Sequence, residues 1–334
     1  MKTLSNLLVI SSVLLSLTAC ATHDDESYFD TSFGMNSEGE SAPAPTGTTQ
    51  LIEIDNGTEV RSFYLYLPTA YLKNPNAASE KWPLVIALHS DSEKDGTGFI
   101  RDTLFTEEAE KNGVLAAFPN RGNFISEIDA ATTRTQVLGD ILSLQSLVEK
   151  TIDYSINLGA DPERVYLLGY GSGSVQGQTI GCNLAARFAA LAFVSGSVIT
   201  ESAETCSPAH FPSVLTIHGT EDLSSPYEGM SSWKGMSIAL SSVSETTDYW
   251  TTKGGCGRSP TVTLMPDLAP DDGTISSRTS YSGCANGRVV ESIIVQNGDH
   301  SYPGGVLPIT YGVSMDFNAN TVILEFFSRY QLGI

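Results

Sequence analysis

The residues with the clearest chemical potential lie where a predicted buried strand turns into a predicted helix. Residues 165–173 read VYLLGYGSG, with glycines at positions 169, 171 and 173. In the pattern Gly-x-Ser-x-Gly, such a strand–turn–helix unit lifts a serine hydroxyl above a sheet, where it can attack an acyl carbon. Here Gly169 and Gly173 hold the outer places, and Gly171 holds the place of the serine. The pattern therefore predicts the backbone of a nucleophile site without its usual nucleophile.

An acid and a base follow later in the chain. Asp222 ends the segment HGTED after a predicted strand, and His300 lies in the turn-rich segment GDHSYPG. Taken singly, an aspartate in a turn is usually a turn former and a single histidine is often structural. Turn site, aspartate and histidine nevertheless follow in the order of nucleophile, acid and base in α/β-hydrolases. We therefore interpret Asp222 and His300 as the remaining catalytic residues of a triad.

Loss of the serine leaves several chemical routes open. In a comparable triad it lowers the rate by about a millionfold, although about 10³–10⁴-fold acceleration over water remains from the oxyanion hole and binding. Ser172 is a candidate substitute, but as the first residue of a helix its side chain is expected to point away from His300. Ser174 and Ser90 are weaker candidates, and a water activated by His300 is another route. Backbone N–H groups of Ser90 and Ser172 are the expected oxyanion donors.

Alternating strands and helices are predicted around these residues. Apolar runs at residues 84–88, 114–118, 165–168, 190–194 and 214–217 are typical of buried parallel strands, and residues 61–67 alternate as a strand near an edge. Helical spacing covers residues 104–112, 137–156 and about 172–188. This order predicts an α/β fold with a mainly parallel central sheet and helices on both faces. Active sites in such sheets lie at the carboxyl ends of the strands, which is where the candidate residues fall.

The N-terminal residues have the composition of an export signal. Residues 1–19 combine a basic start with an apolar stretch, and the segment LTAC that ends at Cys20 resembles the lipobox of bacterial lipoproteins. That resemblance implies acylation of Cys20 and a membrane anchor made of lipid, on the outer membrane or cell surface; ordinary signal cleavage and release is the alternative. Residues 20–50 are acidic and rich in Ser and Pro, as expected of a disordered linker. Residues 51–334 then form one domain.

Four cysteines remain after Cys20, an even number in a chain expected to be exported. Of the three possible pairings we predict Cys182 with Cys206 and Cys256 with Cys284, because each pair is nearest in sequence and closes a loop beside a proposed catalytic segment. No cysteine or histidine spacing indicates a metal site, and no cofactor is expected. The formal net charge of −20 argues against nucleic acid as a partner.

At this point the domain resembles a known family: the secreted esterases grouped with polyhydroxybutyrate depolymerases and with feruloyl or acetylxylan esterases. The resemblance covers about residues 51–327. The matching segments are RSFYLYLP at 61–68, PLVIALH at 83–89, DPERVY at 161–166, VSG at 194–196, HGTED at 218–222 with Pro226-Tyr227, Trp250 before Cys256, and Gly283-Cys284. The resemblance implies an α/β-hydrolase fold, hydrolysis of carboxylic esters, and the acid and base places for Asp222 and His300.

The chain departs from this family at three places. The family has serine where this chain has Gly171, glycine where it has Ser90, and usually tryptophan where it has Tyr302. The first change removes the attacking atom, and the second alters the loop that lends an N–H group to the oxyanion hole. We therefore expect a protein that binds or acts on small or polymeric esters, of polyester, feruloyl or acetyl-glycan type, with impaired catalysis. An active hydrolase that uses Ser172 or a His300-activated water is the alternative.

Overall fold

The computed structural model describes residues 47–55, 59–90, 95–121, 133–206, 208, 210–306 and 312–333. The predicted signal at 1–19, Cys20 and most of the predicted linker at 20–50 lie outside these residues. The first strand, β1 (Thr48–Asp55), begins inside the segment that we assigned to the linker. Among the described residues, no helix combines the length and the apolar character needed to cross a bilayer.

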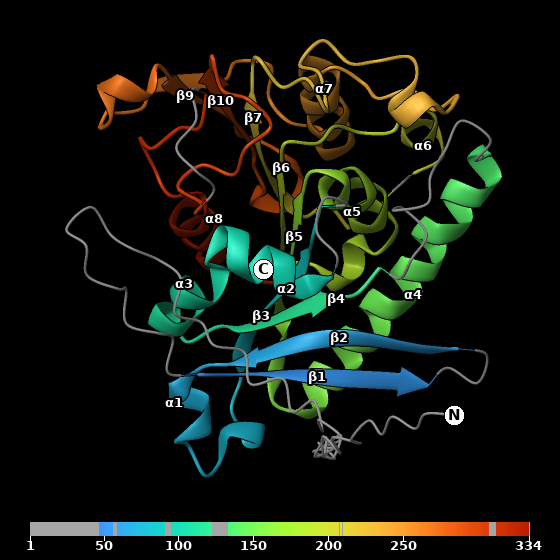
Figure 1. Ribbon diagram of the computed structural model, residues 1–334, viewed down its shortest axis with the longest axis vertical. Helices are drawn as coiled ribbons and strands as arrows, with labels where there is room; N and C mark the ends of the chain where they lie inside the picture. The colour runs from blue at the N-terminus through green and yellow to red at the C-terminus, as the bar shows by residue number, and fades with distance from the viewer. Residues whose placement is uncertain are drawn as a thin grey trace, which may run out of the picture.

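The described strands form one mixed sheet of ten strands (Figure 1). In spatial order they are β1, β2 (Val60–Leu67), β4 (Leu115–Pro119), β3 (Trp82–Leu88), β5 (Ala160–Tyr170), β6 (Ala190–Val194), β7 (Ser213–Gly219), β10 (Val290–Gln296), β9 (Ile275–Tyr281) and β8 (Thr261–Leu264). The strands from β4 to β10 in this order are parallel, and an antiparallel pair flanks them on each side.

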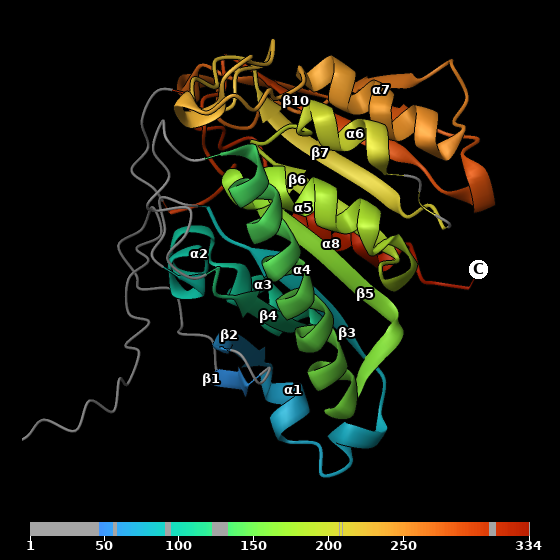
Figure 2. The same ribbon diagram turned by 90° about the vertical axis from the view of Figure 1, so that its right-hand side faces the viewer.

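Helices cover both faces of this sheet (Figure 2). One face packs against α4 (Arg134–Asn157), α5 (Ser172–Asn183) and α7 (Val243–Gly254). The other packs against α2 (Gly96–Thr103), α3 (Phe105–Asn112) and α8 (Ala319–Ser328). The short helices α1 (Thr69–Leu72) and α6 (Thr200–Thr205) lie in connections between strands.

The parallel strands explain why the sequence shows continuous apolar runs. In β3, Leu84, Ile86 and Leu88 contribute to the core under α4 and α5. Val85 and Ala87 contribute to the core under α2, α3 and α8. Because both faces are covered, every side chain in such a strand is buried, and alternation with polar residues disappears. The predicted strands and helices are confirmed within a few residues. The elements that were not predicted are β1, β8, β9, β10, α1, α2, α6, α7 and α8.

Both predicted disulfides are present in the structure. Cys182 at the end of α5 pairs with Cys206, which follows α6. Cys256 after α7 pairs with Cys284, which follows β9. Each bond therefore ties a helix that packs on the sheet to a connection between strands.

Candidate active site

The turn between β5 and α5 has the backbone of a nucleophile elbow. Gly171 has φ +55° and ψ −123°, a left-handed conformation that glycine adopts at little cost. Its N–H donates to the carbonyl of Val194 at 3.0 Å, and its own carbonyl accepts from Val175 N–H at 3.1 Å. A side chain at Gly173 would collide with the backbone of β3 at Leu88 and His89. The strand–turn–helix unit thus keeps its geometry although the serine is absent.

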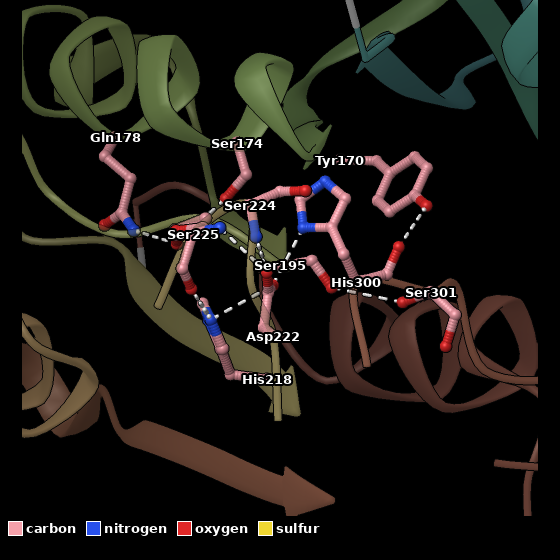
Figure 3. A network of polar contacts seen from close by, with 11 residues as sticks. Tyr170, Ser174, Gln178, Ser195, His218, Asp222, Ser224, Ser225, His300 and Ser301 are labelled. Carbon is pink, nitrogen blue, oxygen red and sulfur yellow. Dashed lines mark hydrogen bonds and ion pairs between the residues drawn. The ribbon is translucent and has the colours of Figure 1, made fainter. Parts of the chain in front are cut away.

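Asp222 and His300 meet at the carboxyl ends of β7 and β10 (Figure 3). Nδ1 of His300 lies 2.8 Å from Oδ2 of Asp222, within hydrogen-bond distance. The Asp222 side chain is fully buried, whereas 26% of the His300 side chain is exposed. This arrangement fixes the imidazole with Nδ1 toward the carboxylate and leaves Nε2 for another group.

The charge on Asp222 is stabilised from several directions. Its Oδ1 accepts from the N–H groups of Ser224 at 2.9 Å and Ser225 at 2.7 Å. Nε2 of His218 lies 3.4 Å from Oδ2 of Asp222 and 2.7 Å from the carbonyl of Ser225. Burial alone would raise the pKa of Asp222, but the contacts with His218 and His300 hold that pKa below its usual range. Asp222 is therefore a carboxylate at neutral pH, able to stabilise a protonated His300.

Contacts from β5 and β6 hold the loop that carries His300 (Figure 3). The Tyr170 hydroxyl donates to the carbonyl of His300 at 3.1 Å, and the two rings stack with centroids 5.8 Å apart. Ser195, which has φ +52°, donates from Oγ to the carbonyl of Ser301 at 3.1 Å. A non-glycine residue held at positive φ costs about 1–3 kcal/mol, which the surrounding contacts must offset.

The base of this pair faces the elbow. A Cβ atom built on Gly171 would lie 3.2 Å from Nε2 of His300. A serine at this position would therefore place its hydroxyl near the imidazole, as a triad requires. The same Cβ would lie only 2.6 Å from Oγ of Ser90, which follows β3 and is buried. The structure thus brings Gly171, Ser90, Asp222 and His300 together.

Ser172 has a different neighbourhood. Its hydroxyl accepts a hydrogen bond from Nη1 of Arg121 at 2.8 Å, and the same nitrogen lies 3.2 Å from Oε1 of Gln176. Arg121 is itself largely buried. The Arg121 hydrogen bond orients the Ser172 hydroxyl toward the guanidinium.

Comparisons with known proteins agree with this architecture. The acetyl xylan esterase from Aspergillus awamori superposes with a TM-score of 0.55 at 17% identity, over 84% of this chain and 99% of that chain. The chain has the α/β-hydrolase fold. Pyrococcus horikoshii acylaminoacyl peptidase superposes with a TM-score of 0.53 at 12% identity, over 86% of this chain and 42% of that chain.

Sequence comparison adds one relative of the chain. A protein of Nocardia uniformis subsp. tsuyamanensis, named "Putative esterase NocK", is 25% identical over an alignment of 288 residues, and the match covers 80% of this chain and 78% of the relative. No family model matches the chain.

Arg121 was missed by the sequence analysis. It follows β4, at the same edge of the α/β-hydrolase sheet as the other site residues. Its Nη2 lies 3.3 Å from Nδ1 of His89, and Nδ1 of His89 lies 2.8 Å from the carbonyl of Ser90. Burial first, and the Arg121 charge second, lower the pKa of His89 to about 3, so this histidine is neutral. Arg121 lies three residues after the predicted strand at 114–118, and this was the available signal.

Tyrosines near the site proved to be mainly core residues. Tyr170 ends β5, and Tyr302 lies in the loop that carries His300. Both are buried, and their rings contact each other edge to face with centroids 5.4 Å apart. The Tyr302 hydroxyl donates to Oδ1 of Asn320 at 2.7 Å. Packing is therefore the role that the structure supports for both residues.

Proposed function

We propose that this protein acts on carboxylic esters, with Asp222 and His300 as the acid and base of its site. The observation that supports this most strongly is the position of Nε2 of His300, 3.2 Å from where a side chain at the elbow would begin. A pair consisting of a buried carboxylate and a partly exposed imidazole is also what general base catalysis needs. The fold shared with an acetyl xylan esterase supports the same reaction class.

In the proposed reaction, Nε2 of His300 takes the proton of the attacking hydroxyl and later gives it to the leaving alcohol. Asp222 holds Nδ1 and stabilises the imidazolium that forms between these steps. The N–H groups of Ser172, at the start of α5, and of Ser90 are proposed to bind the developing oxyanion. A helix N-terminus favours such negative charge.

Gly171 sets the limit on this chemistry, because it has no atom that can attack. An enzyme that relied on water activated by His300 would lack an acyl-enzyme intermediate and would be slow. The hydrogen bond from Arg121 argues against Ser172 as the replacement. A second candidate function, the binding of esters without turnover, is favoured by Gly171 alone.

For the substrate we propose an acetyl, feruloyl or polyester group, small or on a polymer. This class follows from the resemblance to secreted esterases and agrees with the name of the acetyl xylan esterase. We also propose that the protein is exported and held by lipid on Cys20 at the outer membrane or cell surface. Both disulfides fit an oxidising compartment.

The test is hydrolysis of p-nitrophenyl acetate, methyl ferulate and a short hydroxybutyrate oligomer by the purified protein. We expect at least one ester to be cleaved, and cleavage to be lost in His300→Ala. His210→Ala is the matched control, because His210 lies before β7, at the opposite end of that strand from Asp222. Binding of these esters without any cleavage would contradict hydrolysis and support the second candidate.

A further inference from the structure

Two departures from the family pattern are reciprocal. The esterases that this chain resembles have glycine at the place of Ser90, directly after the histidine that follows β3, and serine at the elbow. Here these places hold Ser90 and Gly171. The two residues are far apart in the sequence, but β3 and β5 are neighbouring parallel strands, with Leu88 paired to Gly169. Compared with the family, the hydroxymethyl group is present after β3 and absent after β5, at the same edge of the sheet.

The structure places the Ser90 hydroxyl in the space that the elbow serine would need. A Cβ on Gly171 would lie 2.6 Å from Oγ and 3.1 Å from Cβ of Ser90. Such distances are too short for both side chains to be present without movement. The same point lies 3.2 Å from Nε2 of His300. The Ser90 hydroxyl and the base therefore lie close to one common point, the place of the missing side chain.

The backbone of Ser90 is held in position. Its carbonyl contacts Nδ1 of the His89 ring at 2.8 Å, and that ring is buried beside Arg121. The shorter contact favours the tautomer in which Nδ1–H donates to Ser90. Ser90 is not one of the non-glycine residues with positive φ in the described part of the chain. Ser90 can therefore present its hydroxyl without the positive φ that a serine at position 171 would have to adopt.

We propose that Ser90 is the nucleophile of this protein, an assignment that rests on the ester hydrolysis proposed above. As Oγ of Ser90 bonds to the ester carbonyl carbon, its proton passes to Nε2 of His300. The bond from that carbon to the alcohol oxygen then breaks, and the alcohol leaves with the proton from His300. Water next attacks the acyl–Ser90 ester and gives one proton to His300. Release of the acid returns that proton to Ser90 Oγ.

The first arm of the test is covalent labelling with a fluorophosphonate, which reacts with activated serines whatever the natural ester is. Trypsin separates residues 82–94, which contain Ser90, from residues 165–187, which contain Ser172. We expect the label on the first peptide, with fragment ions that assign it to Ser90. His300→Ala should abolish the label, because the hydroxyl then has no base.

The second arm is the rate of p-nitrophenyl acetate hydrolysis. Ser90→Ala and Ser90→Gly should each lose most activity, by about 10³-fold or more. Two variants are used because Ser90→Gly restores the residue of the resembled family and should fold even if Ser90→Ala does not. Ser213→Ala is the matched control, since Ser213 is a buried serine at the amino end of β7.

The outcomes separate this proposal from the proposed function. Hydrolysis that survives in both folded Ser90 variants but is lost in His300→Ala would overturn Ser90 and keep the ester hydrolase. Labelling of Ser172 would have the same meaning. A folded parent that neither hydrolyses esters nor takes up the label would overturn both.

Discussion

Asp222 accepts hydrogen bonds from two backbone N–H groups and contacts two imidazole rings, although its side chain has no exposed surface. A buried carboxylate with so many partners serves as a fixed charge rather than as a proton carrier. Proton transfer is accordingly left to His300, whose ring is partly exposed. Replacing Asp222 with asparagine removes this charge and keeps almost the same side-chain shape.

Asp222→Asn should lower ester hydrolysis by about 10⁴-fold, because an amide cannot stabilise the imidazolium and can favour the wrong tautomer.

The lowered pKa of Asp222 also predicts a pH effect on stability. Its contribution is fully present above the usual aspartate pKa and is lost as the pH falls through the lower folded value. Urea unfolding of parent and variant at pH 5 and pH 3 measures this. Equal losses of stability in both proteins would contradict the assigned charge state.

His89 provides a second pH dependence at the residue scale. Its folded pKa of about 3 lies below the ordinary histidine value, so the unfolded chain binds the extra proton first as the pH falls. Stability should therefore fall by about 2 kcal/mol between pH 7 and pH 5 from this group. His89→Asn should be less stable at pH 7 but should lose less on going to pH 5, as measured by urea midpoints. A steeper pH dependence in the variant would refute the neutral, buried assignment.

At the scale of elements, the parallel strands were predictable because burial on both faces leaves a plain apolar run. Strand β9, with the sequence ISSRTSY, gave no such signal, since most of its residues are only half-buried. The order of Gly171, Asp222 and His300 was sufficient to predict that they meet. The direction of the Ser90 side chain was not predictable, because it depends on how the loop after β3 approaches the turn after β5. Arg121 was missed for a similar reason: its partners come from α5 and β3.

The disulfide between Cys182 and Cys206 joins the end of α5 to the connection before β7. Removing it with Cys182→Ser and Cys206→Ser together should cost about 2–4 kcal/mol, because the closed loop restricts the unfolded chain. Thermal unfolding gives the loss, with Cys256→Ser and Cys284→Ser as the matched pair from the other bond. An unchanged melting temperature in both double variants would contradict a stabilising role for these bonds.

At the scale of the whole molecule, the strongly acidic chain is proposed to be held at a membrane by lipid and not by its own surface. In a bacterial host, Cys20→Ala should move the protein from the detergent phase to the aqueous phase in a phase-separation assay, because no diacyl group can be attached. We propose that acylation of Cys20 supplies the membrane affinity, since a protein of net charge −20 is repelled by anionic headgroups. Retention of the Cys20→Ala variant in the detergent phase would contradict this proposal.

We propose that the site holds every group that ester hydrolysis needs, with the hydroxyl of Ser90, just after β3, in place of a serine at Gly171. The most direct measurement is p-nitrophenyl acetate hydrolysis by the double variant Ser90→Gly, Gly171→Ser. We predict that it hydrolyses the ester at least as fast as the parent and loses this activity when His300→Ala is added. Gly171→Ser alone should be slower than the double variant, because its Cβ would lie 2.6 Å from the Ser90 hydroxyl. A folded double variant without activity would contradict the claim.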